Sequence, residues 1–304
     1  MLAISLPLSL LVGLVAIELG DLPGGRLSIR ALAWLSASNL AYTAVLFFVK
    51  CLGVLISLVL AARYLDKRPF SGLGFHINKV WCRDFVFGFL LGAFLMSAVF
   101  LIELAAGWVE VTDTFRATGD SFWSMLFFAL TAFICVGFYE EMLSRGYQIR
   151  NLAEGLNMPK IGPRLALGLA WIVTSVAFGF GHSLNPHASL ISSLGVAAAG
   201  ILLGLPYILT GQLAISIGLH ISWNFFQGNV FGFPVSGRDF QVSFIGIKQN
   251  GPEAWTGGLF GPEAGLLSLG ACLVGCLLIL TWVRWLHKKC SLDTRVTVFI
   301  PKVI

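Results

Sequence analysis

The sequence predicts an all-α, polytopic membrane protein, a helical bundle with about eight transmembrane helices. Three observations predict this class. Apolar residues make up 57% of the chain and charged residues only 12%, about half the charged share of a typical soluble domain. Several stretches reach the roughly 20 mostly apolar residues that a spanning helix needs. The Lys and Arg residues lie in short segments beside these stretches, as they do in membrane proteins.

The apolar stretches give the order of the helices along the chain. The first stretch lacks a basic n-region and a clear cleavage site, so we expect a spanning helix there rather than a signal peptide. Residues 229–263 are rich in glycine and proline, and we expect no regular element in them. The predicted spans are 2–19, 38–63, 84–107, 121–152, 163–182, 188–209, 211–228 and 264–286.

Basic residues in the connecting segments predict the orientation of the bundle. Clusters of Lys and Arg occur in residues 63–83, in residues 145–164 and in the tail after 283. The charged residues of 108–120 are mainly acidic. With eight spans the three basic segments share one side, which should be cytoplasmic, together with both termini. The net charge of +5 is explained by these segments, so we expect lipid and not nucleic acid as the partner. Short loops and frequent Trp indicate a prokaryotic plasma membrane.

Ionisable residues inside spans are costly, and they are therefore candidates for a functional site. Glu140 and Glu141 are adjacent in the fourth span, and Arg145 follows Glu141 at the i, i+4 spacing that allows an ion pair. Glu140 points about 100° away on the helix and is left for a different task. The alternative is a helix that ends at Tyr139, which would make both carboxylates interfacial.

Polar groups on two other spans are expected at a similar depth. His182 ends the fifth span, and His220 and Asn224 share one face of the seventh. If the fourth helix continues to about residue 152, Glu140 lies roughly 18 Å from the cytoplasmic end at 1.5 Å per residue. All four groups can then meet in one interior layer. An interfacial histidine is the alternative for His182.

This combination of residues is suited to peptide hydrolysis. A carboxylate in a dry pocket can take a proton from water as a general base. A histidine can orient that water, and a second histidine with an amide can stabilise an oxyanion. Alternatively, Glu140, His182 and His220 could hold a divalent metal such as zinc. The residue types alone leave both mechanisms open.

The pattern Glu140-Glu141-x-x-x-Arg145, Phe178-x-x-x-His182 and His220-x-x-x-Asn224 resembles the CPBP intramembrane peptidases. These include type II CAAX prenyl endopeptidases and bacterial bacteriocin-processing or immunity proteins with the Abi domain. The resemblance implies Glu140 acting with His182, His220 with Asn224 at the oxyanion, and Glu141 and Arg145 in support. Expected substrates are membrane-associated peptides, either lipidated proteins or leader peptides.

The resemblance also implies a division of the chain. Residues 1–64 would form N-terminal transmembrane helices, 65–290 an intramembrane peptidase core, and 291–304 a cytoplasmic tail.

Other functions fit the sequence less well. The GxSG, HExxH and GxGD motifs of other intramembrane peptidases are absent. A proton-coupled transporter could use Glu18, Lys50 and Glu103, which lie in or near spans, but we detect no paired halves. A non-catalytic scaffold or immunity protein would retain the same motifs for packing alone.

Overall fold

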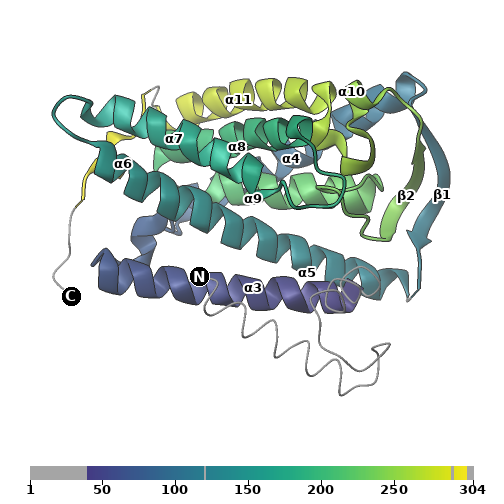
Figure 1. The fold of residues 1–304 in the computed structure, drawn as a ribbon, viewed down its shortest axis with the longest axis horizontal. Helices are drawn as coiled ribbons and strands as arrows, with labels where there is room; N and C mark the ends of the chain where they lie inside the picture. Colours follow the sequence, from purple (N-terminus) through teal and green to yellow (C-terminus); the bar gives the residue numbers. More distant parts are fainter. Residues whose placement is uncertain (1–39, 120, 289–290, 300–304) are drawn as a thin grey trace, which may run out of the picture.

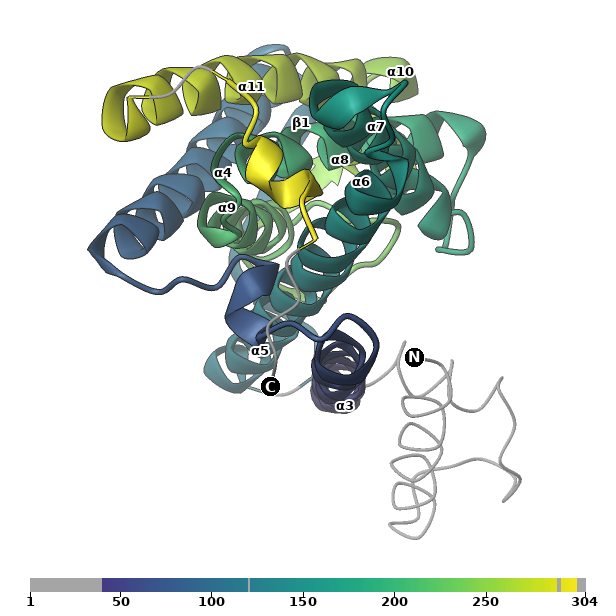
Figure 2. The same ribbon diagram turned by 90° about the vertical axis from the view of Figure 1, so that its left-hand side faces the viewer.

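The chain forms a bundle of long apolar helices with a small sheet at one end (Figures 1 and 2). The computed structural model describes residues 40–119, 121–288 and 291–299. Within these, six helices are long and apolar enough to cross a membrane, so the predicted all-α membrane bundle is confirmed. The predicted span at 2–19 lies outside the described residues.

The helices run back and forth along the long axis of the bundle. Each predicted span of the described region contains a helix, and the bounds agree to within about five residues. The helices are α3 (Leu40–Leu60), α4 (Lys79–Ala105), α5 (Phe122–Glu141), α6 (Arg150–Leu156), α7 (Gly162–Gly181), α8 (Leu190–Thr210), α9 (Ala214–Phe225), the short α10 (Glu253–Thr256) and α11 (Leu266–His287).

The fourth span has the length that the site hypothesis requires. The helix does not end at Tyr139: Phe122–Leu156 is one continuous span of 35 residues. Its middle, Met142–Ile149, is wound as a π-helix between α5 and α6. A π-helical segment is rare and is frequently found at functional sites. Here it begins directly after Glu141.

The span predicted at 211–228 differs from the others. The helix α9 has only 12 residues, and all residues from Ala214 to Trp223 are buried. It lies inside the bundle, where α4 packs against it (Figure 2). Apolar content predicted a membrane span here, because burial in protein and burial in lipid select the same residue types.

Glycines permit the close approach of α4 to α9. A Cβ atom at Gly92 would lie 2.2 Å from Ser222 Oγ and 2.6 Å from the Leu219 carbonyl oxygen. A Cβ atom at Gly88 would lie 2.3 Å from the Ile215 carbonyl oxygen. This GxxxG pair therefore serves helix packing. The pair Gly200 and Gly204 in α8 faces α7 in the same way.

Residues 229–263 contain regular structure that the sequence did not predict. Strand β2 (Val242–Gln249) pairs antiparallel with β1 (Val109–Ala117), and Val109 lies opposite Gln249. The expectation of an irregular segment was therefore wrong. The pairing partner comes from the acidic loop after α4, 130 residues away, so local composition could not reveal it. Glu103 anchors this sheet, because its Oε2 accepts a hydrogen bond of 2.8 Å from Gln249 Nε2.

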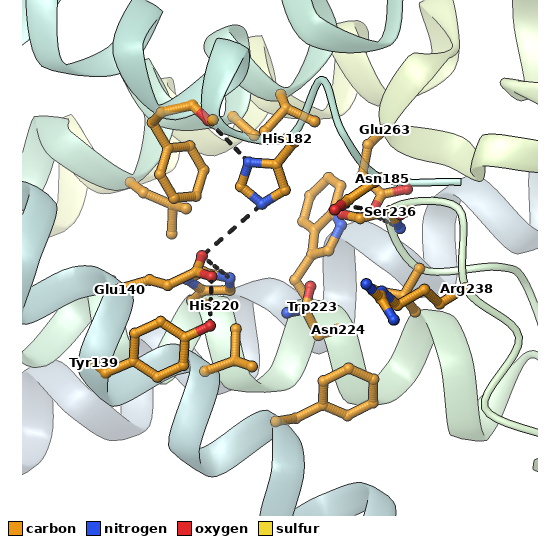
Figure 3. A pocket seen from close by; sticks show the side chains of 18 of the residues that line it. Tyr139, Glu140, His182, Asn185, His220, Trp223, Asn224, Ser236, Arg238 and Glu263 are labelled. Carbon is orange, nitrogen blue, oxygen red and sulfur yellow. Dashed lines mark hydrogen bonds and ion pairs between the residues drawn. The ribbon is translucent and has the colours of Figure 1, made fainter. Parts of the chain in front are cut away.

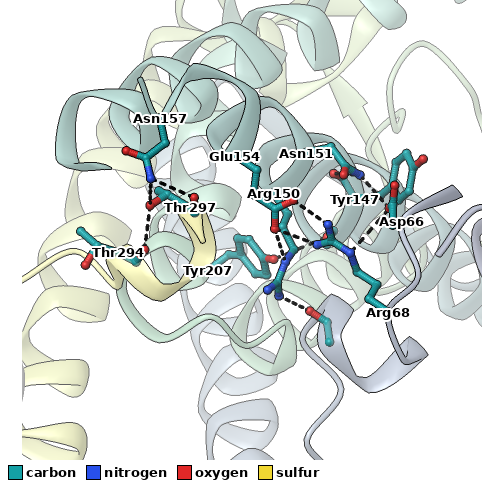
Figure 4. A network of polar contacts seen from close by, with 12 residues as sticks. Asp66, Arg68, Tyr147, Arg150, Asn151, Glu154, Asn157, Tyr207, Thr294 and Thr297 are labelled. Carbon is teal, nitrogen blue, oxygen red and sulfur yellow. Dashed lines mark hydrogen bonds and ion pairs between the residues drawn. The ribbon is translucent and has the colours of Figure 1, made fainter. Parts of the chain in front are cut away.

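The basic segments meet at the end of the bundle opposite the sheet (Figure 4). Arg68 donates to both oxygens of Glu154, at 2.9 and 2.5 Å, and Arg150 donates to Glu154 at 3.0 Å. Asn157 binds Thr297 in the C-terminal segment. These contacts bring together the loop after α3, helix α6 and the residues after α11, as the alternation of spans requires.

Candidate active site

A cavity of about 200 Å³ lies inside the bundle. Its walls come from helices α3, α5, α7, α8 and α9 and from the segment between α9 and β2. Aliphatic and aromatic side chains form most of the surface. The polar residues that line it are Lys50, Tyr139, Glu140, His182, Asn185, His220, Asn224, Ser236, Arg238 and Glu263.

Glu140 lies between the two histidines that the sequence analysis singled out (Figure 3). Its Oε2 is 4.0 Å from His182 Nε2 and also 4.0 Å from His220 Nε2. Its Oε1 accepts a hydrogen bond of 3.0 Å from the Tyr139 hydroxyl. No described residue donates a hydrogen bond to Oε2. One carboxylate oxygen is therefore fixed, and the other faces the space between the rings.

Each histidine is oriented through its Nδ1 atom. His182 caps the end of α7, and its Nδ1 is 2.8 Å from the Phe178 carbonyl oxygen. Because a carbonyl can only accept, this Nδ1 carries the proton. His220 Nδ1 lies 2.7 Å from Glu141 Oε1. Both rings consequently direct Nε2 toward Glu140.

Glu141 and Arg145 form the predicted ion pair, at 2.9 Å. Both are buried: Glu141 has no exposed side-chain surface and Arg145 has 2%. Arg145 also donates to the Gly200 carbonyl oxygen and stacks on the Phe178 ring. The same Oε1 of Glu141 contacts both Arg145 and His220, so this carboxylate orients a cavity residue in addition to closing an ion pair.

Asn224 lines the cavity one helical turn after His220. Its side-chain amide has no hydrogen bond with another described residue and remains available to a ligand. The structure thus brings Glu140, His182, His220 and Asn224 around one space. Another π-helical segment, Phe226–Val230, begins directly after α9.

Several cavity residues were not predicted as part of the site. Tyr139 gives no sequence signal, since a tyrosine in a membrane helix is common. Lys50 was noticeable as a charge in a span, and its Nζ lies 4.7 Å from the centre of the Tyr139 ring. Arg238 and Glu263 come from the segment expected to be irregular. Glu263 is almost fully buried, and this burial raises its pKa to about 7.

The donor atoms around Glu140 do not fit a tetrahedral zinc ion as they stand. Zinc bonds of about 2.0–2.1 Å place neighbouring ligand atoms about 3.3 Å apart. Glu140 Oε2 is 4.0 Å from each Nε2, and an ion bound to all three would require them to close by about 0.7 Å. No group of three described His, Cys, Asp or Glu residues has metal-binding geometry. We therefore derive no step through a metal.

Comparison with known families places the same residues in one domain. Residues 122–226 match the family described as type II CAAX prenyl endopeptidase Rce1-like. The match extends from the first residue of α5 to the residue after α9. Comparisons with curated proteins and with solved structures gave no match. The segment that carries Glu140, His182, His220 and Asn224 thus matches an Rce1-like protease domain, and the chain that contains it is an integral membrane protein.

Proposed function

We propose that the protein is an intramembrane endopeptidase that hydrolyses a peptide bond of a membrane-associated substrate. The observation that carries the proposal is the position of Glu140 Oε2, at 4.0 Å from Nε2 of both His182 and His220. A water molecule bound at about 2.8 Å to a carboxylate oxygen and to a ring nitrogen spans such a gap. Glu140 and His182 can therefore orient the attacking water.

The proposed reaction then proceeds by proton transfer through Glu140 and by hydrogen bonds from His220 and Asn224. Water attacks the carbonyl carbon while its proton passes to Glu140, which acts as the general base. His220, protonated and paired with Glu141, donates from Nε2 to the developing oxyanion, and the Asn224 amide donates beside it. The C–N bond then breaks, and the leaving amine takes the proton from Glu140. Tyr139 holds the other oxygen of Glu140 in place.

The cavity walls support a membrane-associated substrate. Apolar side chains from α8, α9 and α3 line the space beside Glu140, and the surrounding helices have the composition of bilayer spans. The matched family acts on prenylated CAAX proteins by its name, so lipidated peptides are the substrates that we propose. Peptides with a leader segment are the alternative class.

We further propose that the end with the basic segments faces the cytoplasm of a prokaryotic cell. This end contains Arg68 and Arg150, and it lies opposite the acidic strand β1 (Figures 1 and 4). Lys and Arg remain on the cytoplasmic side during insertion. Labelling of single cysteines placed in each loop, in intact cells, tests this orientation.

Cleavage of a lipid-anchored peptide by purified protein tests the activity. We expect Glu140→Ala and His220→Ala to abolish cleavage while the detergent-solubilised protein stays folded. Glu110→Ala, which removes an exposed carboxylate of β1, is the matched control and should cleave normally. Full activity in either site variant would refute the assignment. Cleavage by the wild type would also exclude a scaffold without catalysis.

A further inference from the structure

Among the described residues, Lys50 and Arg238 are the basic side chains that line the cavity, and of these two Lys50 alone has a described partner. Lys50 lies over the ring of Tyr139. Arg238 lines the cavity opposite Glu140 (Figure 3), and its guanidinium has no hydrogen bond or ion pair with another described residue. Arginine binds carboxylates through two parallel hydrogen bonds when they are available. The Arg238 side chain is exposed at the cavity, so its guanidinium is solvated and accessible to a carboxylate that enters.

Two carboxylates, one adjacent to Arg238 in the chain and one in the same cavity, contact other residues. Asp239, the next residue in the chain, forms an ion pair of 2.8 Å with Arg116 of β1. Glu263 lines the same cavity, but its Oε2 accepts from Gln227 and its Oε1 accepts from Ser236. Neither acid neutralises Arg238.

The turn that carries Arg238 is held firmly. Val235 and Arg238 exchange two backbone hydrogen bonds, of 2.9 and 3.0 Å. Ser236 is fixed by Glu263 through its backbone N–H and its hydroxyl, and Asn185 Nδ2 donates to the Ser236 carbonyl.

Gly237 closes the turn. It has a φ of +82°, and a Cβ atom there would lie 1.9 Å from the Pro186 carbonyl oxygen. Its N–H donates to the Phe260 carbonyl at 2.6 Å. A rigid turn that presents a charged side chain is suited to recognition, because little entropy is lost when the ligand binds.

We propose that Arg238 is a specificity-determining residue that binds a carboxylate of the substrate peptide beside the bond that is cut. The inference rests on the proposed peptidase activity and names the substrate chemistry that the cavity selects. A C-terminal carboxylate and an acidic side chain present the same group. Arg238 lies outside the matched domain, in the segment after α9, so this selectivity is a feature of this chain's own loop.

Four lipid-anchored peptides of one sequence test the inference with the purified full-length protein. The first ends in a free carboxylate and the second in a carboxamide. The third and fourth are carboxamides with Glu or Gln near the C-terminal end. We expect kcat/KM to be about 10- to 100-fold higher for one carboxylate form than for its neutral partner, as for a hydrogen bond to a charged group. The pair that differs identifies the source of the carboxylate.

Variants then assign the preference to Arg238. Arg238→Gln should reduce the ratio of kcat/KM values to about one, and Arg238→Lys should retain part of it. Arg164→Gln, which removes an exposed arginine of α7 that does not line the cavity, should leave the ratio unchanged.

Three outcomes overturn the inference. The first is that the wild type cleaves the two peptides of each pair with equal kcat/KM. The second is that Arg238→Gln leaves the wild-type ratio of kcat/KM values unchanged. The third is that Arg238→Gln lowers kcat/KM equally for carboxylate and carboxamide peptides, which would assign Arg238 to lipid binding or folding. If the wild type cleaves none of the peptides, the proposed peptidase activity itself fails.

Discussion

Glu140 and Glu141 are adjacent in the sequence, yet we expect their replacement by glutamine to have different effects on stability. Glutamine keeps the size of the side chain and an acceptor oxygen but removes the charge. Glu141 has no exposed side-chain surface, and its Oε1 faces the buried guanidinium of Arg145. Removing one partner of a buried ion pair typically costs about 3–5 kcal/mol. Because the amide oxygen can still accept a hydrogen bond, we expect Glu141→Gln to lower the free energy of unfolding by about 3 kcal/mol.

Glu140→Gln should change stability much less. The carboxylate is 17% exposed in the cavity and accepts a single hydrogen bond from the described residues, from Tyr139. The expected change is about 1 kcal/mol or smaller. Its effect on cleavage should be the larger of the two, at least about 100-fold, because the proposed general base is lost.

Unfolding in detergent, followed by tryptophan fluorescence, measures both free energies under the same conditions. Cleavage of a lipid-anchored peptide is measured on the same preparations. The reasoning is refuted if Glu141→Gln is as stable as the wild type, or if Glu140→Gln is the less stable variant. Either result would mean that the buried ion pair does not support the bundle.

Three further predictions concern packing, pH and the basic end of the bundle. Gly92→Ala should destabilise the protein by about 1–3 kcal/mol through overpacking. Gly168→Ala should leave stability unchanged, because a Cβ atom there meets nothing within 4 Å. Equal unfolding midpoints for the two variants would contradict this prediction. Folding raises the pKa of Glu263 from 4.5 to about 7, so the native state holds a proton that the unfolded chain loses. The free energy of unfolding should then fall by roughly 3 kcal/mol between those pH values, and a pH titration of unfolding should show no such fall in Glu263→Gln. Glu154→Gln should cost more stability than Arg68→Gln, because Glu154 loses two arginine partners and Arg68→Gln leaves one of them; the opposite order in unfolding experiments would contradict the network.

The sequence predicted the parts of the site that depend on spacing within one helix. Glu141 and Arg145 meet because they are four residues apart, and the long fourth span places Glu140 at mid-depth. The meeting of three separate helices around Glu140 was predicted from depth alone. The catalytic assignment of these residues stays a prediction.

The features that the sequence missed depend on contacts between distant segments. Strand β2 exists because β1 pairs with it, and no local pattern in a glycine-rich segment reveals a partner so far away. The position of Arg238 depends on the turn that Asn185 and Glu263 hold in place. The interior location of α9 was missed because hydropathy does not distinguish a protein neighbour from a lipid neighbour.

The enclosure of α9 separates two cavity residues, His220 and Asn224, from the surrounding bilayer. Outer helices tilt or bend when the hydrocarbon layer becomes thicker or thinner than their apolar length. Every residue of α9 from Ala214 to Trp223 is buried, so this helix contacts protein rather than lipid. The positions of His220 and Asn224 are therefore set by packing against α4 and α5 and not by lipid. We therefore expect the geometry of the cavity to stay the same in membranes of different thickness, while the outer helices adapt to each membrane.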